Sequence, residues 1–166
     1  MGVLQMTDTN EQDKIWDEFL DRWPPSKLAT MTLSDYTQVG SKDTFTHWIE
    51  SRLDKLGSIW GGSSFKFGVY SRKDEEAKQN DARVSYSDSH AWYSALGTTA
   101  NEAFLKVRSF IVQVAEMAAK GDLDGIESLE VLGEACKWKI AFHYQDRRSP
   151  SILCVFKKEM LSAFVG

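Results

Sequence analysis

Cysteine and long apolar runs are both scarce in this chain, and each scarcity excludes a class of protein. The two cysteines, Cys136 and Cys154, cannot build a disulfide framework, and neither stands in a CxxC or Cys/His spacing that binds zinc. The longest apolar helical stretch, residues 103–119, contains Arg108 and Glu116, which a membrane span would not tolerate. No signal peptide is recognisable, so we expect a reduced, cytoplasmic protein without membrane contact.

An excess of basic residues is also missing. The chain has 20 Lys and Arg against 24 Asp and Glu, a formal net charge of −4 and a sequence pI near 5.4. Strong non-specific binding to nucleic acid relies on cations that displace counterions, so this balance argues against it. The charge is uneven: residues 1–60 hold six Lys or Arg against ten Asp or Glu, and residues 137–159 hold six against two. A nucleic acid would therefore meet the C-terminal part more favourably.

Recognisable catalytic motifs are missing as well. The sequence has no GxSxG, no HExxH and no nuclease-like Asp…ExK arrangement, and its histidines, His47, His90 and His143, are scattered. Gly61 and Gly62 do not form a phosphate-binding loop, because such a loop follows a strand, precedes a helix and ends in Gly-Lys-Ser/Thr. We therefore expect no enzyme active site, no metal and no cofactor in this chain.

Three stretches of the sequence have helical periodicity. Residues 11–23, 45–56 and 99–121 repeat apolar side chains at the i, i+3, i+4 spacing of an amphipathic helix. Capping boxes at Thr9 and Thr99 predict where the first and third helices begin. The third is the longest and most regular, so we expect it to cover one face of a sheet.

Other segments predict β-strands. Apolar side chains alternate in residues 65–70 and in KWKIAFHYQD, residues 137–146. A short strand is predicted at residues 83–86, and SILCVFKK, residues 151–158, is predicted to pair with residues 137–146 through the turn RRSP. The closing EMLSAFVG, residues 159–166, has the pattern of a short helix.

The order of these elements indicates the fold class. Because the predicted helices are grouped rather than alternating with strands, we expect an α+β fold: a small mixed or antiparallel sheet packed against the long helix, with N-terminal helices. The length suits a single domain, residues 1–166. Within it we expect an N-terminal helical arm at residues 1–26 and an α+β domain at residues 27–166.

The stretch SIWGGSSFKFGVYSR, residues 58–72, combines rings, glycines and a cation. Gly68 would weaken a strand unless something approaches its backbone closely. Lys66 and Tyr70 are predicted on the same face as Gly68, and a cation beside a ring suits a nucleotide or another planar ligand. A bulge, or a large ring packed over the glycine, explains Gly68 equally well.

Two further rings, Trp92 and Tyr93, stand in SDSHAWYS, residues 87–94. Aromatic side chains on loops can sandwich an extruded base. A core position for Trp92 beneath the long helix fits equally well, and the sequence leaves both interpretations open.

Three blocks carry a family resemblance: MTLSDYTQVGSKDTFTHWIESRLDKLGSIWGGSSFKFGVYSR, KWKIAFHYQD and ILCVFKKEML. Together they resemble the N-terminal region ahead of the AAA+ motor in McrB-like, modification-dependent (type IV) restriction proteins, over residues 28–165. In that family the N-terminal domain recognises DNA, often with a modified base, while the motor and a partner nuclease do the work. The resemblance implies that residues 27–166 are a DNA-recognition domain, that a motor follows in the parent chain and that a nuclease subunit is a partner.

The candidate DNA contacts rest on residue chemistry. The aromatic members would stack on or cage a flipped base, either a modified cytosine or another modified base. The glycines and the serine would contact that base or a phosphate, and the Lys and Arg members would neutralise the DNA backbone. The candidates are Trp60, Gly61, Gly62, Ser63, Lys66, Tyr70, Trp92, Tyr93, Lys139, Arg147 and Arg148.

Two other functions stay open at this point. A protein-interaction or oligomerisation module of a defence ATPase would tolerate the acidic balance more easily than a DNA reader. A small-ligand or nucleotide sensor could use the same aromatic residues.

Overall fold

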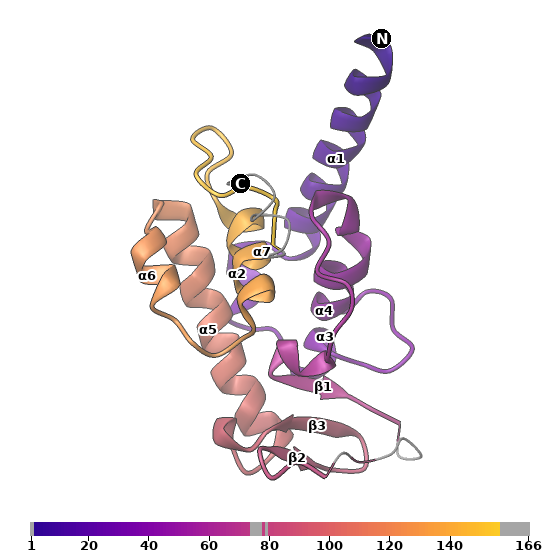
Figure 1. Cartoon of the computed structure of the whole chain (residues 1–166), viewed down its shortest axis with the longest axis vertical. Helices are drawn as coiled ribbons and strands as arrows, with labels where there is room; N and C mark the ends of the chain where they lie inside the picture. Colours follow the sequence, from indigo (N-terminus) through magenta and orange to yellow (C-terminus); the bar gives the residue numbers. More distant parts are fainter. Residues whose placement is uncertain (1, 74–77, 79, 157–166) are drawn as a thin grey trace, which may run out of the picture.

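The computed structural model describes residues 2–73, 78 and 80–156. Helices form most of the regular structure, and a small sheet lies at one end of helix α5, Ala100–Lys120 (Figure 1). In chain order the elements are α1 Gly2–Arg22, α2 Pro25–Leu28, α3 Leu33–Tyr36, α4 Phe45–His47, the π-helix η1 Trp48–Arg52, the 3-10 helices η2 Asp54–Leu56 and η3 Ser64–Phe67, β1 Val69–Ser71, β2 Val84–Tyr86, β3 His90–Tyr93, the 3-10 helix η4 Ser94–Leu96, α5 Ala100–Lys120, α6 Leu123–Glu127 and α7 Glu134–Tyr144.

Helix α5 is the predicted long helix, and both of its ends have the expected caps. The Thr99 hydroxyl accepts from the Glu102 amide at 3.1 Å, and the Glu102 carboxylate accepts from the Thr98 amide at 2.8 Å. Gly121 ends the helix in the left-handed conformation, with φ at 72°. Its apolar stripe is buried, so α5 supports the sheet and the neighbouring helices.

The sheet is antiparallel, with strand order β1-β3-β2. Val69 of β1 lies opposite Trp92 of β3, and both side chains are buried on the face toward α5. The α+β class, with a small antiparallel sheet on a long helix and helices at the N-terminus, is therefore confirmed. Strand β2 matches the prediction at residues 83–86, but β3 lies in a segment that has no clean alternation in sequence.

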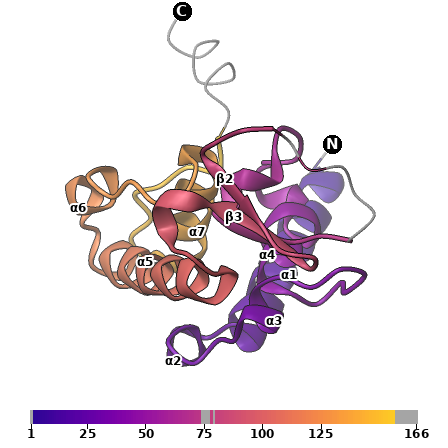
Figure 2. The same cartoon turned by 90° about the horizontal axis from the view of Figure 1, so that it is seen from below.

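The predicted strand at residues 137–146 is wrong, because this segment is helix α7. Figure 2 shows α7 between α5 on one side and α1 and α4 on the other. From Cys136 to Tyr144 every side chain except Trp138 is buried. A helix buried all round needs no one-sided apolar stripe, so its sequence can alternate polar and apolar residues by coincidence.

Three other boundaries differ from the predictions. Residues 151–156 run without regular structure beside α7, while residues 157–166, including the predicted closing helix, lie outside the described residues. Helix α1 begins at Gly2, so Thr9 lies inside the helix rather than at its N-terminus. The predicted helix at 45–56 is three short pieces, α4, η1 and η2, in one continuous helical run.

The first strand also begins later than predicted. Residues 64–67 form η3, because the Ser63 hydroxyl accepts from the Phe65 amide at 3.2 Å and Gly68 ends the turn with φ at 75°. The strand pairing begins only at Val69. Phe65 and Phe67 are therefore buried turn residues rather than alternating strand residues.

The core is rich in aromatic rings and includes the second half of α1. Trp16 stacks on Phe142 of α7 with ring centroids 4.6 Å apart, and its indole donates to the His143 carbonyl at 2.9 Å. Phe19 lies 5.3 Å from the His143 ring and 5.6 Å from the Tyr144 ring. These residues belong to one hydrophobic cluster that continues through α5, so this part of α1 packs as an element of the core.

Candidate functional site

The outer face of the sheet, turned away from α5, carries a tyrosine on each strand. The register places Tyr70 of β1 and Tyr86 of β2 opposite the same central residue, Ala91 of β3. Directly opposite residues share one face of an antiparallel sheet, so these three form a row across the strands. Tyr93, two residues from Ala91, lies on the same face opposite Val84. Tyr70, Tyr86 and Tyr93 are together called the tyrosine face.

Two buried side chains pack against the tyrosine face. The Phe65 ring lies 5.0 Å from the Tyr70 ring, edge-on, and 5.2 Å from the Tyr93 ring. The Arg72 guanidinium lies 5.5 Å from the Tyr86 ring centroid and donates to the Ser87 carbonyl at 3.3 Å. All three tyrosines are half-buried, so each ring is held by neighbours and still keeps an accessible part.

The loop before η3 contains Trp60 and connects η2 to the turn that holds Phe65. The Trp60 side chain is 70% exposed, and the loop leads within five residues into Phe65. The Lys66 ammonium donates to the Ile59 carbonyl at 2.9 Å and to the Gly61 carbonyl at 3.0 Å, on either side of Trp60. The same ammonium forms an ion pair with Glu50. Lys66 therefore holds the backbone on both sides of Trp60 in place.

Gly61, Gly62 and Ser63 shape this loop. Both glycines have positive φ, 98° and 69°, and no atom lies within 4 Å of where a side chain would begin. They turn the chain in a conformation that glycine adopts most easily. Ser63 is occupied as the cap of η3. The three residues thus form the turn that links Trp60 to η3.

A shallow pocket of about 350 Å³ lies on one side of the Trp60 indole. It is lined by Glu50, Ser51, Asp54, Ser58 and Trp60. Two of these five side chains are carboxylates, and one of them is neutralised by Lys66. The negative potential on this side of the ring disfavours a phosphate and tolerates a base or a cation.

Two predicted DNA contacts are corrected by burial. Lys139 is fully buried on α7, where its ammonium donates to the Leu53 carbonyl at 3.0 Å. Burial lowers the pKa of Lys139 to about 8, although Asp54 acts in the opposite direction. Trp92 is only 4% exposed, and its indole donates to the Gly97 carbonyl at 2.9 Å. In this structure Lys139 cannot reach a DNA backbone and Trp92 cannot cage a base.

The two predicted arginines lie away from the tyrosine face. They belong to the loop after α7, which is at the opposite end of the molecule from the sheet (Figure 1). Arg147 pairs with Asp13 and Asp17 of α1, and its guanidinium lies 4.5 Å from the Trp16 ring centroid. Arg148 pairs with Asp146, and 90% of its side chain is exposed. The structure therefore brings Tyr70 and Tyr93 together on one sheet face, with Trp60 in the loop that precedes Phe65, and places both arginines elsewhere.

Tyr86, Phe65 and Arg72 belong to the site but were not among the sequence candidates. The predicted strand at residues 83–86 already contained Tyr86, yet its alignment with Tyr70 depends on how the three strands pair. That pairing is a long-range property, because β1 and β2 meet only through β3. A sequence signal for Tyr86 existed, but no local pattern assigned it to the same face as Tyr70 and Tyr93.

Neither a metal site nor a membrane span is found in the part of the chain that the structure describes. Across the described ranges, no three His, Cys, Asp or Glu side chains are placed so that they could hold a metal ion. In the same ranges, no helix is both long enough and apolar enough to cross a membrane.

Fold and site together define an α+β domain with a half-exposed aromatic sheet face and an exposed tryptophan in a loop held by Lys66. No family model, curated protein or solved structure matches this chain. The resemblance to McrB-like restriction proteins thus stays a prediction from the sequence blocks.

Proposed function

We propose that this chain is the non-catalytic DNA-recognition module of a McrB-like restriction protein and that it reads a modified, flipped base with Trp60 and the tyrosine face. The observation that carries the proposal is that Trp60 is 70% exposed in a loop held by Lys66, five residues before Phe65, whose ring packs against Tyr70 and Tyr93. Rings that are fixed before binding can stack on a planar base with little loss of side-chain entropy.

Base stacking, rather than phosphate contact, supplies the affinity in this proposal. Each base stacked on an aromatic ring contributes on the order of 1–3 kcal/mol. The cations nearest the rings are engaged within the protein: Lys66 pairs with Glu50, Arg72 is buried, and Arg83, although 81% exposed, pairs with Asp81. A reader that selects its target through a small aromatic site can work despite the net charge of −4. An AAA+ motor in the parent chain and a nuclease subunit would then act on the bound DNA.

Duplex binding tests the proposal. Gel shift and fluorescence anisotropy at low salt should detect binding to duplexes with plain, methylated and hydroxymethylated cytosine, with preference for one modified form. Trp60→Ala should weaken binding to that form about tenfold, because one stacked ring is lost. Tyr93→Leu, which keeps apolar contact with Phe65 but removes the flat phenol ring, should reduce the ratio of affinities between modified and plain duplexes.

The matched control is Leu105→Ala, since Leu105 is 43% exposed on α5, away from the outer sheet face. This variant should bind every duplex as the wild type does. Absence of binding by any duplex at tens of micromolar, with a folded wild-type protein, would show the DNA proposal to be wrong. Self-association instead would favour an oligomerisation module.

A further inference from the structure

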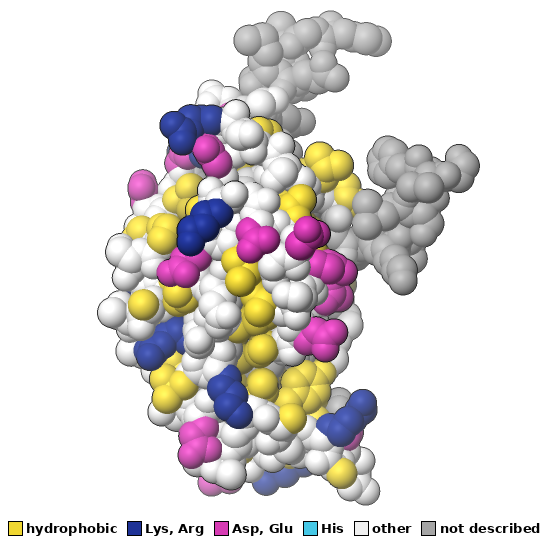
Figure 3. Space-filling view, turned by 90° about the vertical axis from the view of Figure 1, so that its left-hand side faces the viewer, with side chains coloured by type: hydrophobic (Ala, Val, Ile, Leu, Met, Phe, Trp, Pro, Cys, Tyr) yellow, Lys and Arg dark blue, Asp and Glu magenta, His cyan; other side chains and the backbone are white. Residues whose placement is uncertain are grey.

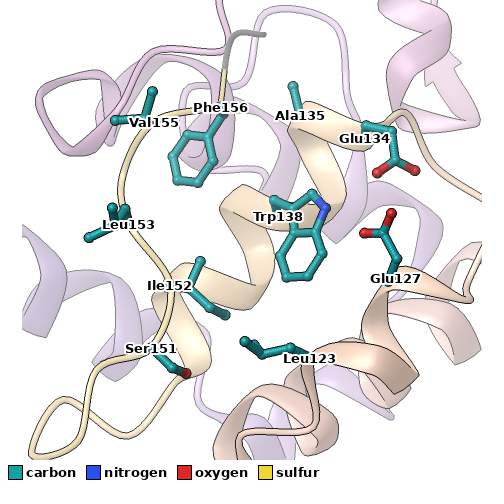
Figure 4. A pocket seen from close by; sticks show the side chains of 10 residues that line it. All are labelled: Leu123, Glu127, Glu134, Ala135, Trp138, Ser151, Ile152, Leu153, Val155 and Phe156. Atoms are coloured by element: carbon teal, nitrogen blue, oxygen red, sulfur yellow. The ribbon is translucent and has the colours of Figure 1, made fainter. Parts of the chain in front are cut away.

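A second surface, apolar and unrelated to the tyrosine face, is a groove of about 640 Å³ between α6, α7 and residues 151–156. Seven of its ten lining side chains are apolar, Trp138 among them, and Leu123, Ile152 and Phe156 lie nearest its ring (Figure 4). The lining residues are Leu123, Glu127, Glu134, Ala135, Trp138, Ser151, Ile152, Leu153, Val155 and Phe156. Trp138 is the one side chain between Cys136 and Tyr144 of α7 that is not buried, so the helix turns it into this groove.

Residues 151–156 form one wall of the groove, and hydrogen bonds with Gln145 hold this wall in position. The Gln145 side-chain oxygen accepts from the Ser151 and Ile152 amides, each at 2.9 Å, and its amide nitrogen donates to the Ile152 carbonyl at 3.0 Å. On the far side, Gly57 allows close packing: a side chain there would begin 2.5 Å from the Phe156 ring and from the Cys154 carbonyl. The groove therefore exists before any ligand arrives.

The rim of the groove is acidic on the side of α6. Residues 121–136 contain five Asp or Glu and no Lys, Arg or His. Figure 4 shows the Glu127 and Glu134 carboxylates converging beside the indole of Trp138. Glu134 pairs with Lys137 at 2.8 Å, whereas Glu127 has no ion-pair partner among the described side chains. On this side of the molecule, acidic side chains border a run of hydrophobic ones (Figure 3).

Leu153 continues the apolar surface outward from the groove. It is 77% exposed, on a backbone that Gln145 fixes at the preceding residue. An exposed leucine next to an apolar groove with a charged rim is the usual composition of a surface that receives a protein partner. The carboxylates repel nucleic acid from this side.

We propose that this groove binds an amphipathic, basic helix of a protein partner. Apolar side chains at i, i+3, i+4 and i+7 of that helix pack on Trp138, Ile152 and Leu153. Lysine or arginine beside this apolar stripe pairs with Glu127 and Glu134. A second copy of this chain is disfavoured, because a two-fold interface would bring the same acidic rims together. The proposal is independent of the DNA-reading function.

The test uses the whole chain and a synthetic probe. The probe is a fluorescein-labelled, helix-forming peptide with leucines at i, i+3, i+4 and i+7 and lysines beside them. Anisotropy should detect saturable binding below about 100 μM. Glu127→Lys, which reverses an exposed charge at the rim, and Leu153→Asp, which places a charge on the exposed apolar wall, should each weaken binding at least about tenfold.

Matched controls separate this groove from general charge attraction. Glu18→Lys makes the same charge reversal at an exposed residue of α1, and Val39→Asp makes the same kind of apolar-to-acidic change at a residue 43% exposed elsewhere. Both should bind the peptide as the wild type does. A peptide with the same composition but scattered leucines should bind at least about tenfold more weakly.

Four outcomes overturn the proposal. They are failure of the wild type to bind the probe, equal affinity for the scattered peptide, equal loss of binding in Glu18→Lys, and wild-type affinity in Leu153→Asp. Sedimentation that shows self-association abolished by Leu153→Asp, with no peptide binding, assigns the groove to a second copy instead.

Discussion

His143 shows at the scale of one residue how burial decides a side chain's chemistry. Its ring lies among Trp16, Phe19 and Phe142, with Nδ1 donating to the Lys139 carbonyl at 2.7 Å. Nε2 is buried without a hydrogen-bond partner among the described residues. Burial lowers the pKa of His143 to about 3, so the ring is neutral near pH 7.

This burial predicts acid sensitivity. The folded-state pKa of His143 is far below its ordinary value of 6.5, so the unfolded chain binds the proton first as the pH falls. The stabilisation is complete above about pH 6.5 and is lost toward pH 3. In His143→Leu, the loss of unfolding free energy between pH 7 and pH 4.5 should shrink by roughly 2 kcal/mol. Urea unfolding at the two pH values measures this, and an unchanged difference would contradict it.

Two residues of α7 show why the strand prediction for residues 137–146 was wrong. Lys139 and His143 look like solvent-facing members of an alternating strand, and both are fully buried in α7. Lys139 can be buried because its long side chain reaches the Leu53 carbonyl, a group 86 residues away in sequence. No local pattern contains that partner, so the assignment of Lys139 to DNA could not be corrected from sequence.

At the scale of elements, Gly68 decides how η3, β1 and α5 fit together. It has φ at 75°, and a side chain added there would begin 2.9 Å from Val107 and 3.2 Å from both Leu96 and Leu132. The glycine is thus explained by close packing of aliphatic side chains. A ligand approaching its backbone has no room at this position.

Substitution of Gly68 should therefore be costly. Gly68→Ala combines a strained φ with a steric clash against α5, and we expect a loss of about 3 kcal/mol in unfolding free energy. The control is Gly61→Ala, which has a similar φ of 98° but open space around it. That variant should lose only about 1 kcal/mol. Urea unfolding compares them, and equal losses would mean that packing at Gly68 contributes little.

For the whole molecule, the distribution of charge sets the mode of nucleic-acid binding. The formal net charge is −4, and the cations nearest the tyrosine face and on α7 are paired or buried, with Arg83 the strongly exposed one, paired with Asp81. Arg148 is strongly exposed but lies in the loop after α7. A DNA ligand at the tyrosine face would therefore make few phosphate contacts.

A shallow dependence on salt follows from that arrangement. With no more than about two phosphates neutralised, duplex affinity should fall only about tenfold between 50 and 200 mM monovalent salt. Anisotropy titrations over this range give the slope of log affinity against log salt. A slope near −6 or steeper would require about seven phosphate contacts and would place the binding surface elsewhere.

The sequence by itself determined the fold class of this protein and the position of its most regular helix, α5. Helical periodicity and the cap at Thr99 located α5, and grouped helices indicated an α+β fold, because these are local signals within one element. Only the tertiary structure decided that residues 137–144 are a central helix, that Trp92 is core and that Tyr70, Tyr86 and Tyr93 share a face. Burial on all sides hides periodicity, and strand register joins residues far apart, so neither property can be read from neighbouring residues.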